Sequence, residues 1–292
     1  MLKTLSRIPL FISMIRYGNA HNRDFGREHA AFFDDMLTDL QGLGVPSLEG
    51  LKVLDVGCGK AYWLSLLTAA KGAEATGIDP EAVRAEISFG KYWRILRANG
   101  LERFARTLLW DVAYRSPYYD ALSKASGLAL DHRKVALERA GVSPLPFEDN
   151  SFDLVVSHEV FEHLPDMDSA AREVRRVLKP DGLTYIFVHS FTSISGGHHI
   201  AWKYPDKEPS DTVPAWDHLR DNTHPNIPSW VNGFREPIYR EAFEREFDIL
   251  DWKYSHREGE LLLTSQVREE LSEYSEHELL TKGFTIIARP KA

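Results

Sequence analysis

One stretch of this chain, Leu51 to Pro80, restricts the fold more than any other. Short apolar runs predict buried strands, and apolar residues three and four positions apart predict a helix with one buried face. Both patterns occur here, on either side of a turn of small residues in which the backbone can bend sharply. In order, the parts are a strand at Val53–Val56, a turn at Gly57-Cys58-Gly59, a helix at Ala61–Ala70 and a strand at Ala75–Ile78. The stretch is therefore predicted to be a βαβ unit.

The turn and the end of the second strand predict a ligand that contains a ribose. Gly57 and Gly59 let a ligand approach the backbone closely, and Asp79, about 20 positions on, can accept hydrogen bonds from ribose hydroxyls. The dinucleotide fingerprint requires a third glycine where Tyr62 stands, and no lysine followed by serine or threonine completes a phosphate-binding loop. The alternative is a glycine turn in an α/β protein that binds no nucleotide.

Three motifs give the chain a resemblance to a known family. The run Asp55-Val-Gly-Cys-Gly59, with Asp79 ending the next strand, resembles the class I S-adenosylmethionine-dependent methyltransferases. The segment His158-Glu-Val-Phe-Glu-His-Leu164 resembles the E-H-L element of the small-molecule methyltransferases called type 11. A third match to the same family is the turn Leu178-Lys-Pro-Asp-Gly182.

The resemblance implies a fold and an activity. The fold would be α/β, a Rossmann-like doubly wound sheet of seven mostly parallel strands with an antiparallel last strand, plus a helical insertion and a cap. The activity would be methyl transfer from S-adenosyl-L-methionine to a small-molecule acceptor by in-line attack, with S-adenosyl-L-homocysteine as product. The protein would then mainly align the acceptor and exclude water. The alternative is a non-catalytic, cofactor-binding domain of this fold with a regulatory or assembly role.

The resemblance also implies which residues bind the cofactor. Val142 is expected to offer backbone groups to adenine, because Gly141 stands where many relatives carry an aspartate for the adenine amino group. Cys58 is expected to be a small filler of the turn and not a nucleophile. The set is Gly57, Cys58, Gly59 and Tyr17 at the methionyl end, Asp79 and Pro80 at the ribose, Val142 at adenine, Ser157 near the sulfonium, and Asp55 ordering polar groups beneath the site.

Histidines are the candidates for a general base, which is needed only if the acceptor must lose a proton. His158 directly follows a predicted strand end, and His198 and His199 lie in the predicted cap. The alternative is that His158 only caps the next helix or lines the site. The histidines at 158 and 163 are five apart, so H-E-x-x-H is absent and one helix face cannot hold both. No metal is therefore expected. The sequence also lacks the N-P-P-Y element that amino-directed DNA methyltransferases carry after this strand, so it does not resemble that class of enzyme.

Composition limits the partners. A net charge of −8 argues against a nucleic-acid-binding surface. A single cysteine fits a reducing compartment, and we expect a cytoplasmic protein. No run of 18 apolar residues is present, and the apolar run 8–15 is interrupted by Pro9 and lacks a cleavage site, so neither a transmembrane segment nor a signal peptide is expected. The pattern is compatible with a homo-oligomer and with peripheral contact to a membrane.

The rest of the chain is assigned in order. An N-terminal helical segment at 1–50 is expected to precede a methyltransferase domain at 51–292, with a helical insertion at about 81–137 and an acceptor cap at 191–240. The arginines of the first insertion fit a solvated face, or else a subunit interface or an anionic docking patch. The aromatic residues of the second either stack on the acceptor or anchor the loop itself. The remaining predicted elements are helices at 1–16, 22–40, 88–109, 118–128, 167–178, 238–247 and 260–279, and strands at 134–138, 152–157, 183–188, 248–254 and 283–288.

Overall fold

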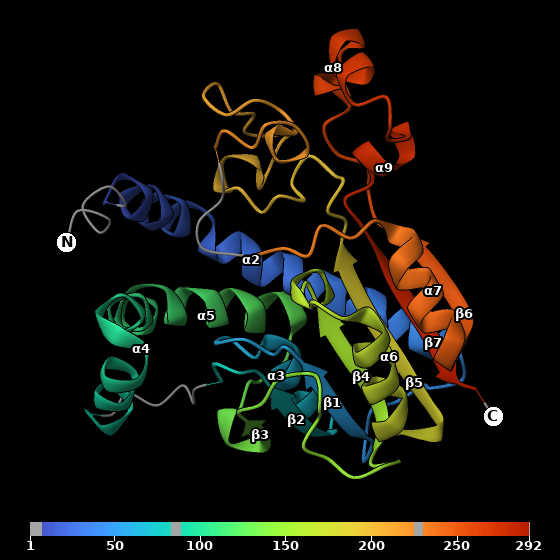
Figure 1. Ribbon diagram of the computed structural model, residues 1–292. Coiled ribbons are helices and arrows are strands. Elements are labelled where there is room, and N and C mark those ends of the chain that lie inside the picture. Colours follow the sequence, from blue (N-terminus) through green and yellow to red (C-terminus); the bar gives the residue numbers. More distant parts are fainter. Residues whose placement is uncertain (1–7, 83–88, 225–229, 292) are drawn as a thin grey trace. The chain divides into compact units, whose positions relative to one another are not determined.

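A computed structural model describes residues 8–82, 89–224 and 230–291, and its core is a seven-stranded sheet (Figure 1). The strand order is β3-β2-β1-β4-β5-β7-β6. Strand β7 runs antiparallel to both of its neighbours, and the pairs β1–β2, β2–β3 and β4–β5 are parallel. The predicted fold class, a mostly parallel doubly wound sheet with an antiparallel last strand, is confirmed.

The chain divides into two compact units, Met1–Ala140 and Gly141–Ala292. The strands are β1 (Lys52–Val56), β2 (Glu74–Ile78), β3 (Val135–Glu138), β4 (Phe152–His158), β5 (Leu178–His189), β6 (Phe247–Tyr254) and β7 (Gly283–Pro290). The α-helices are α2 (Ile8–Gly42), α3 (Trp63–Ala70), α4 (Phe89–Leu109), α5 (Arg115–Ser126), α6 (Met167–Val177), α7 (Glu236–Glu246), α8 (Ser265–Glu270) and α9 (Glu276–Leu280).

The first unit places three parallel strands beside helices α2, α3 and α5. Four of the five residues of β1 are buried, as its apolar sequence requires for a strand covered on both faces. Helices α2 and α5 pack against each other, which Figure 1 shows in blue and green. Residues Ala30, Phe33, Met36 and Leu40 form the buried stripe of α2 at helical spacing.

Two predictions about helices in the first unit need correction. The two N-terminal helices expected at 1–16 and 22–40 are one helix, α2, and residues 1–7 lie outside the described part. The sequence offers no proline between them, and Pro9 stands in the first turn, where its missing N–H is tolerated. The helices expected in the insertion are present as α4 and α5, but a π-helical turn, Trp110–Tyr114, connects them. Gly100, with φ of 80°, interrupts the regular helix of α4.

The second unit pairs β4 with β5 and adds the antiparallel pair β7 and β6. Opposite residues in the parallel pair include Ser157 with Ile186 and His158 with Phe187. The L-K-P-D-G turn does not precede β5 as expected but lies inside it, where the pairing with β4 is irregular. Helices α6 and α7 pack against each other, side by side in Figure 1. The helical inset expected at 260–279 is shorter, consisting of α8, α9 and a 3-10 turn at Glu260–Leu262.

The long segment after β5 is held by its own apolar side chains. Trp202 is 3% exposed and Trp216 is fully buried, and the Trp216 indole donates to the carbonyl of Leu279 at 3.2 Å. Their cluster contains Ile194, Trp202, Val213, Trp216, Leu263, Leu271, Leu279 and Leu280. These two tryptophans therefore anchor the loop, which is the second of the two alternatives that the sequence left open. The 191–240 segment as an acceptor cap stays a prediction.

Within the described ranges, none of the helices has the length and apolar character needed to cross a membrane.

Replacing Trp216 by alanine should destabilise the second unit by about 3–5 kcal/mol, because it empties a fully buried aromatic site. Denaturant unfolding followed by circular dichroism measures this. Trp230, which is 59% exposed, provides the matched control, and Trp230→Ala should stay within about 0.5 kcal/mol of the unchanged protein. Equal effects of the two substitutions would contradict the anchoring role.

Candidate functional site

The turn after β1 is fixed by hydrogen bonds to the end of β2. The N–H groups of Gly57 and Cys58 both donate to the carbonyl of Ile78, at 2.8 and 3.0 Å. Gly57 and Gly59 have φ of 74° and 61°, a region that favours glycine. A Cβ on Gly59 would find no described atom closer than 3.9 Å, so the backbone here faces open space. This is the environment a backbone-bound ligand needs.

A small polar group lies buried directly beneath the turn. Asp55 accepts hydrogen bonds from the Ser65 N–H at 3.0 Å and from its hydroxyl at 2.6 Å. A Cβ on Gly77 would come within 2.9 Å of the Cys58 sulfur, so glycine is required there. Burial raises the pKa of the Cys58 thiol, which keeps it protonated and inert. Asp55 thus orders Ser65, and Cys58 fills space against β2.

Asp79 lies half-buried at the end of β2 and faces the same turn. Its Oδ2 accepts the Gly59 N–H at 3.2 Å, and its Oδ1 accepts the Glu81 N–H at 2.6 Å. Two carboxylate oxygens have about four acceptor positions, so these bonds leave capacity for ribose hydroxyls. The next residue, Pro80, is exposed, and its carbonyl accepts two hydrogen bonds from Arg139.

Aromatic residues around the turn were not anticipated from the sequence. Tyr62 occupies the position of the missing third glycine with φ of 31°, and its hydroxyl pairs with Nδ1 of His132 at 2.7 Å. Tyr119 donates its hydroxyl to the Ala61 carbonyl at 2.8 Å. The helical insertion at about 81–137 therefore contacts the turn after β1, through residues of α5 and of the segment before β3. Only the aromatic content of 81–137 signalled this role.

In the second unit, β4 ends at Ser157 and His158. Ser157 is fully buried, and the half-buried His158 ring stacks on Phe187 at 5.0 Å between centroids. Burial lowers the pKa of His158 to about 4, so its imidazole is neutral at pH 7. Burial alone would raise the pKa of the next residue, Glu159, but the charge of Lys203 holds it well below its ordinary value.

The remaining predicted site residues lie in several places. His199 accepts the Ala201 N–H at its Nδ1 and so caps a short 3-10 turn, a structural role. Val142 is buried, and a Cβ on the preceding Gly141 would meet no atom within 4 Å. Tyr17 lies in α2, where only the helical backbone is described. His198 is next to His199 in the sequence but contacts other residues, which form the group described next.

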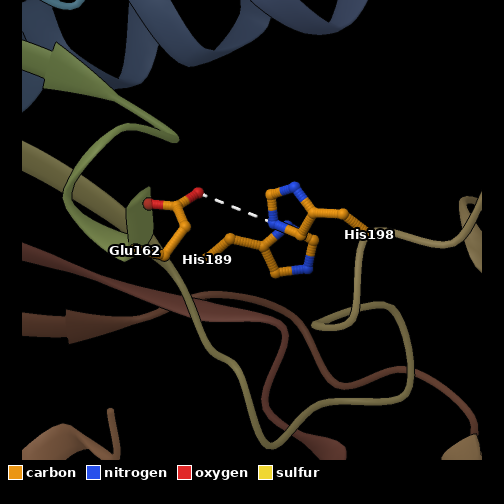
Figure 2. Close-up of side chains that lie close together, drawn as sticks. All are labelled: Glu162, His189 and His198. Atoms are coloured by element: carbon orange, nitrogen blue, oxygen red, sulfur yellow. Dashed lines mark ion pairs between the residues drawn. The ribbon is translucent and has the colours of Figure 1, made fainter. Parts of the chain in front are cut away.

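That group consists of Glu162, His189 and His198, which were not expected to lie together (Figure 2). One ligand atom from each residue lies within 4.8 Å of the other two, and Glu162 Oε1 is 3.7 Å from His198 Nε2. Glu162 comes from a 3-10 turn after β4, His189 from the end of β5, and His198 from the following loop. The three residues are far apart in the sequence, so no motif spacing relates them, and the tertiary fold brings His189 and His198 to Glu162.

Comparison with known protein families shows to which family the chain belongs. The profile of the methyltransferase domain family matches residues 25–232. The chain belongs to this family. The recognition of a methyltransferase is confirmed at the level of this family, and with it the enzyme class. The turn at Gly59, open in front of its backbone and with Asp79 beside it, fits the S-adenosylmethionine that the resemblance implies as cofactor.

Curated relatives match this methyltransferase over part of their length. The ubiquinone biosynthesis O-methyltransferase of Bordetella avium is 32% identical over 139 residues, which are 48% of this chain and 43% of the relative. The enzyme of the same name from Pseudomonas aeruginosa strain PAO1 is 32% identical over 140 residues, 48% of this chain and 44% of the relative. The match thus spans less than half the length of these curated relatives.

A solved structure of an S-adenosylmethionine-dependent methyltransferase from Mesorhizobium loti is similar at 17% identity with a TM-score of 0.45, covering 84% of this chain and 93% of that one.

The raised pKa of the buried Asp55 carboxyl should make the stability of the protein depend on pH. Burial raises the pKa of Asp55 to about 7 in the folded protein, although the bonds from Ser65 act in the opposite direction. The folded protein therefore holds this proton more tightly than the unfolded chain, in which the pKa is about 3.9. The free energy of unfolding should fall as the pH rises from about 4 to about 7, by up to about 4 kcal/mol, and then stay level.

The substitution Asp55→Asn removes this titration while keeping an oxygen acceptor for Ser65. The variant should gain stability relative to the unchanged protein between pH 5 and pH 8, measured by denaturant unfolding at both values. Parallel stability curves for the two proteins over this range would contradict the shifted pKa.

Proposed function

We propose that this chain transfers a methyl group from S-adenosylmethionine to a hydroxyl oxygen of a small molecule. The observation that carries the proposal is the turn at Gly57–Gly59, whose backbone is open at Gly59 and has the Asp79 carboxylate beside it. The names of the curated relatives, ubiquinone biosynthesis O-methyltransferases, support oxygen as the methylated atom and a small acceptor. The net charge of −8 disfavours a nucleic-acid acceptor.

The proposed roles follow from the contacts of each residue. Gly57 and Gly59 present backbone to the methionyl part of the cofactor, and Asp79 accepts hydrogen bonds from the ribose. When bound, S-adenosylmethionine supplies an electrophilic methyl group. In the second unit, Ser157 and His158 end a strand at its carboxyl side, where open α/β sheets place their chemistry. His158, neutral at pH 7, can accept a proton there.

A non-catalytic cofactor-binding domain is the competing function. The intact turn and the hydrogen-bonded Asp79 support a site that binds cofactor, and the proton-accepting state of His158 favours catalysis over binding alone. A cytoplasmic location, a homo-oligomer and peripheral membrane contact stay predictions from the sequence.

The substitution Asp79→Ala should weaken S-adenosylmethionine binding roughly tenfold or more, because it removes hydrogen bonds to a charged acceptor worth about 1.5–3 kcal/mol. Calorimetric titration of the folded variant measures the affinity. Glu81→Ala removes a neighbouring exposed carboxylate and is the matched control, which should bind within about twofold of the unchanged protein. Unaltered affinity in Asp79→Ala would refute ribose binding by this residue.

The substitution His158→Asn should lower kcat by roughly 10²–10⁴-fold if His158 is the base, because asparagine cannot accept a proton at neutral pH. A base must be unprotonated to act, so kcat/KM should rise with pH through about 4 and be level from about pH 5 to 8. This limb lies below the value near 6.5 of an unperturbed histidine, because His158 is buried. If the variant keeps most of its kcat, His158 is not the base that accepts the proton of the acceptor hydroxyl.

A further inference from the structure

Glu162 differs from the other buried acids of the described chain. Asp55 and Glu258 each accept hydrogen bonds from a serine N–H and hydroxyl, Asp111 accepts from Tyr92, and Asp217 accepts from Thr223 and from a backbone N–H. Glu162 is 1% exposed, and neither of its carboxylate oxygens makes a hydrogen bond of normal geometry with the described residues, although the backbone N–H groups of Glu162 and His189 and the charge of Lys203 lie near enough to favour its ionised form. Leaving a buried polar group unsatisfied costs about 1–3 kcal/mol, and more for a charged one. A missing positive partner would account for this.

Only one of the two ring nitrogens of His189, Nε2, makes a hydrogen bond with the described residues. Ser195 donates its hydroxyl hydrogen to Glu258 at 2.5 Å, and its oxygen lies 2.7 Å from His189 Nε2. Since the serine hydrogen is already used, His189 must donate from Nε2, which leaves a lone pair on Nδ1. His189 is 2% exposed, and its Nδ1 lies 3.6 Å from Glu159 Oε1 and makes no hydrogen bond with the described residues. Metal-binding histidines show this arrangement, with the other ring nitrogen donating to a fixed acceptor.

His198 brings a second imidazole to the same place. Its Nε2 is 3.7 Å from Glu162 Oε1, and its ring centroid is 4.8 Å from that of His189. Figure 2 shows the three side chains pointing toward one another. Imidazole nitrogens are common ligands of transition-metal ions. The residue has φ of 54°, a conformation that costs energy outside glycine and is found preferentially at functional sites.

The surrounding chain holds the three side chains in position. Asn232 donates to the carbonyls of Phe161 and Leu164, both at 3.0 Å, and its N–H donates to the Glu162 carbonyl at 2.8 Å. The loop before His198 is packed so closely that a Cβ on Gly197 would come within 2.6 Å of the His218 ring. Ligands held on a rigid scaffold are what a metal site requires.

A buried ion pair between Glu162 and His198 is the alternative to a bound cation. Glu162 Oε1 and His198 Nε2 are 3.7 Å apart, which is beyond hydrogen-bond distance. His189 Nδ1 takes no part in that pair, and it lies 3.6 Å from Glu159 Oε1, also beyond hydrogen-bond distance. A cation at the centre of the three side chains would give the Glu162 carboxylate and His189 Nδ1 a direct partner.

We propose that Glu162, His189 and His198 bind one divalent transition-metal ion of the zinc type. Two imidazole nitrogens and one carboxylate oxygen form a known zinc ligand set, which leaves a position for a water or a substrate. Zinc at about 2.0–2.2 Å from each ligand would space the ligand atoms roughly 3.3 Å apart. The observed separations, 3.7 Å between Glu162 and His198 and at most 4.8 Å overall, need only small side-chain rotations.

The place of the ion suggests its use. Glu162 and His189 both follow the carboxyl ends of β4 and β5, the side on which the proposed acceptor would bind. An ion there would lower the pKa of an acceptor hydroxyl that binds to it. This use rests on the proposed function, whereas the metal site itself does not.

Metal uptake tests the site directly. The tag-free chain, stripped with a chelator, should take up about one equivalent of Zn²⁺, measured by calorimetry and by elemental analysis, and Co²⁺ should give visible absorption bands. Glu162→Gln and His198→Asn should each lose affinity by roughly 100-fold or more, and His199→Asn, altered at a neighbouring histidine outside the group, should take up the ion like the unchanged protein. Ser195→Ala, which frees the His189 ring, should lose roughly 10- to 100-fold.

Folding and cofactor binding are checked independently, by circular dichroism and by the shift in Tm that S-adenosylhomocysteine produces in each variant. A chain that takes up no Zn²⁺, Co²⁺, Mn²⁺ or Fe²⁺ at micromolar concentration, or a folded Glu162→Gln variant that takes up the ion as well as the unchanged protein, would overturn the proposal. Stoichiometric uptake that depends on Glu162 without any methyl transfer would uphold the metal site and refute the proposed function instead.

Discussion

The paired donation from Gly57 and Cys58 to the Ile78 carbonyl is the interaction on which the first unit depends. It bends the chain at the end of β1, so that the turn closes over the end of β2 instead of continuing the strand. The bend brings the Gly59 N–H to Asp79, and it sets the Cys58 sulfur against Gly77. A side chain at 77 would push Cys58 away, and the same bonds would be lost. The shape of the proposed cofactor site is therefore a consequence of two small residues, Cys58 and Gly77, facing each other across neighbouring strands.

Much of this could be predicted from the sequence because it is local. The apolar runs, the glycine turn and the carboxylate after β2 lie within one short stretch, and strand periodicity places them without knowledge of the fold. The order of elements then restricts the sheet to a few topologies. Boundaries were less accurate, since the start of α3 depends on Tyr62 adopting φ of 31°, which its sequence does not indicate.

What could not be predicted depends on contacts between distant residues. Glu162 and His189 are brought together because His158 pairs with Phe187 across β4 and β5, a register that no sequence pattern records. The aromatic content of the loop after β5 was visible, but whether Trp216 faces a ligand or a core depends on leucines near the C-terminus. The sequence therefore identifies residues that can do chemistry, and only the packing shows which of them are used to hold the structure.

Residues with a strained backbone conformation also follow the strands of the sheet. Tyr62, Glu159 and His198 are not glycines, yet they have φ of 31°, 54° and 54°, and they follow β1, β4 and β5. Such conformations cost about 1–3 kcal/mol each and persist only where neighbouring bonds impose them. The bonds are present: Tyr62 is held through His132, the Glu159 N–H donates to the Phe187 carbonyl, and the His198 N–H donates to the Ser195 carbonyl. Tyr62 uses this conformation to bury its ring in the core, where it is 1% exposed, whereas Glu159 and His198 use it to bring their polar side chains to the carboxyl ends of β4 and β5.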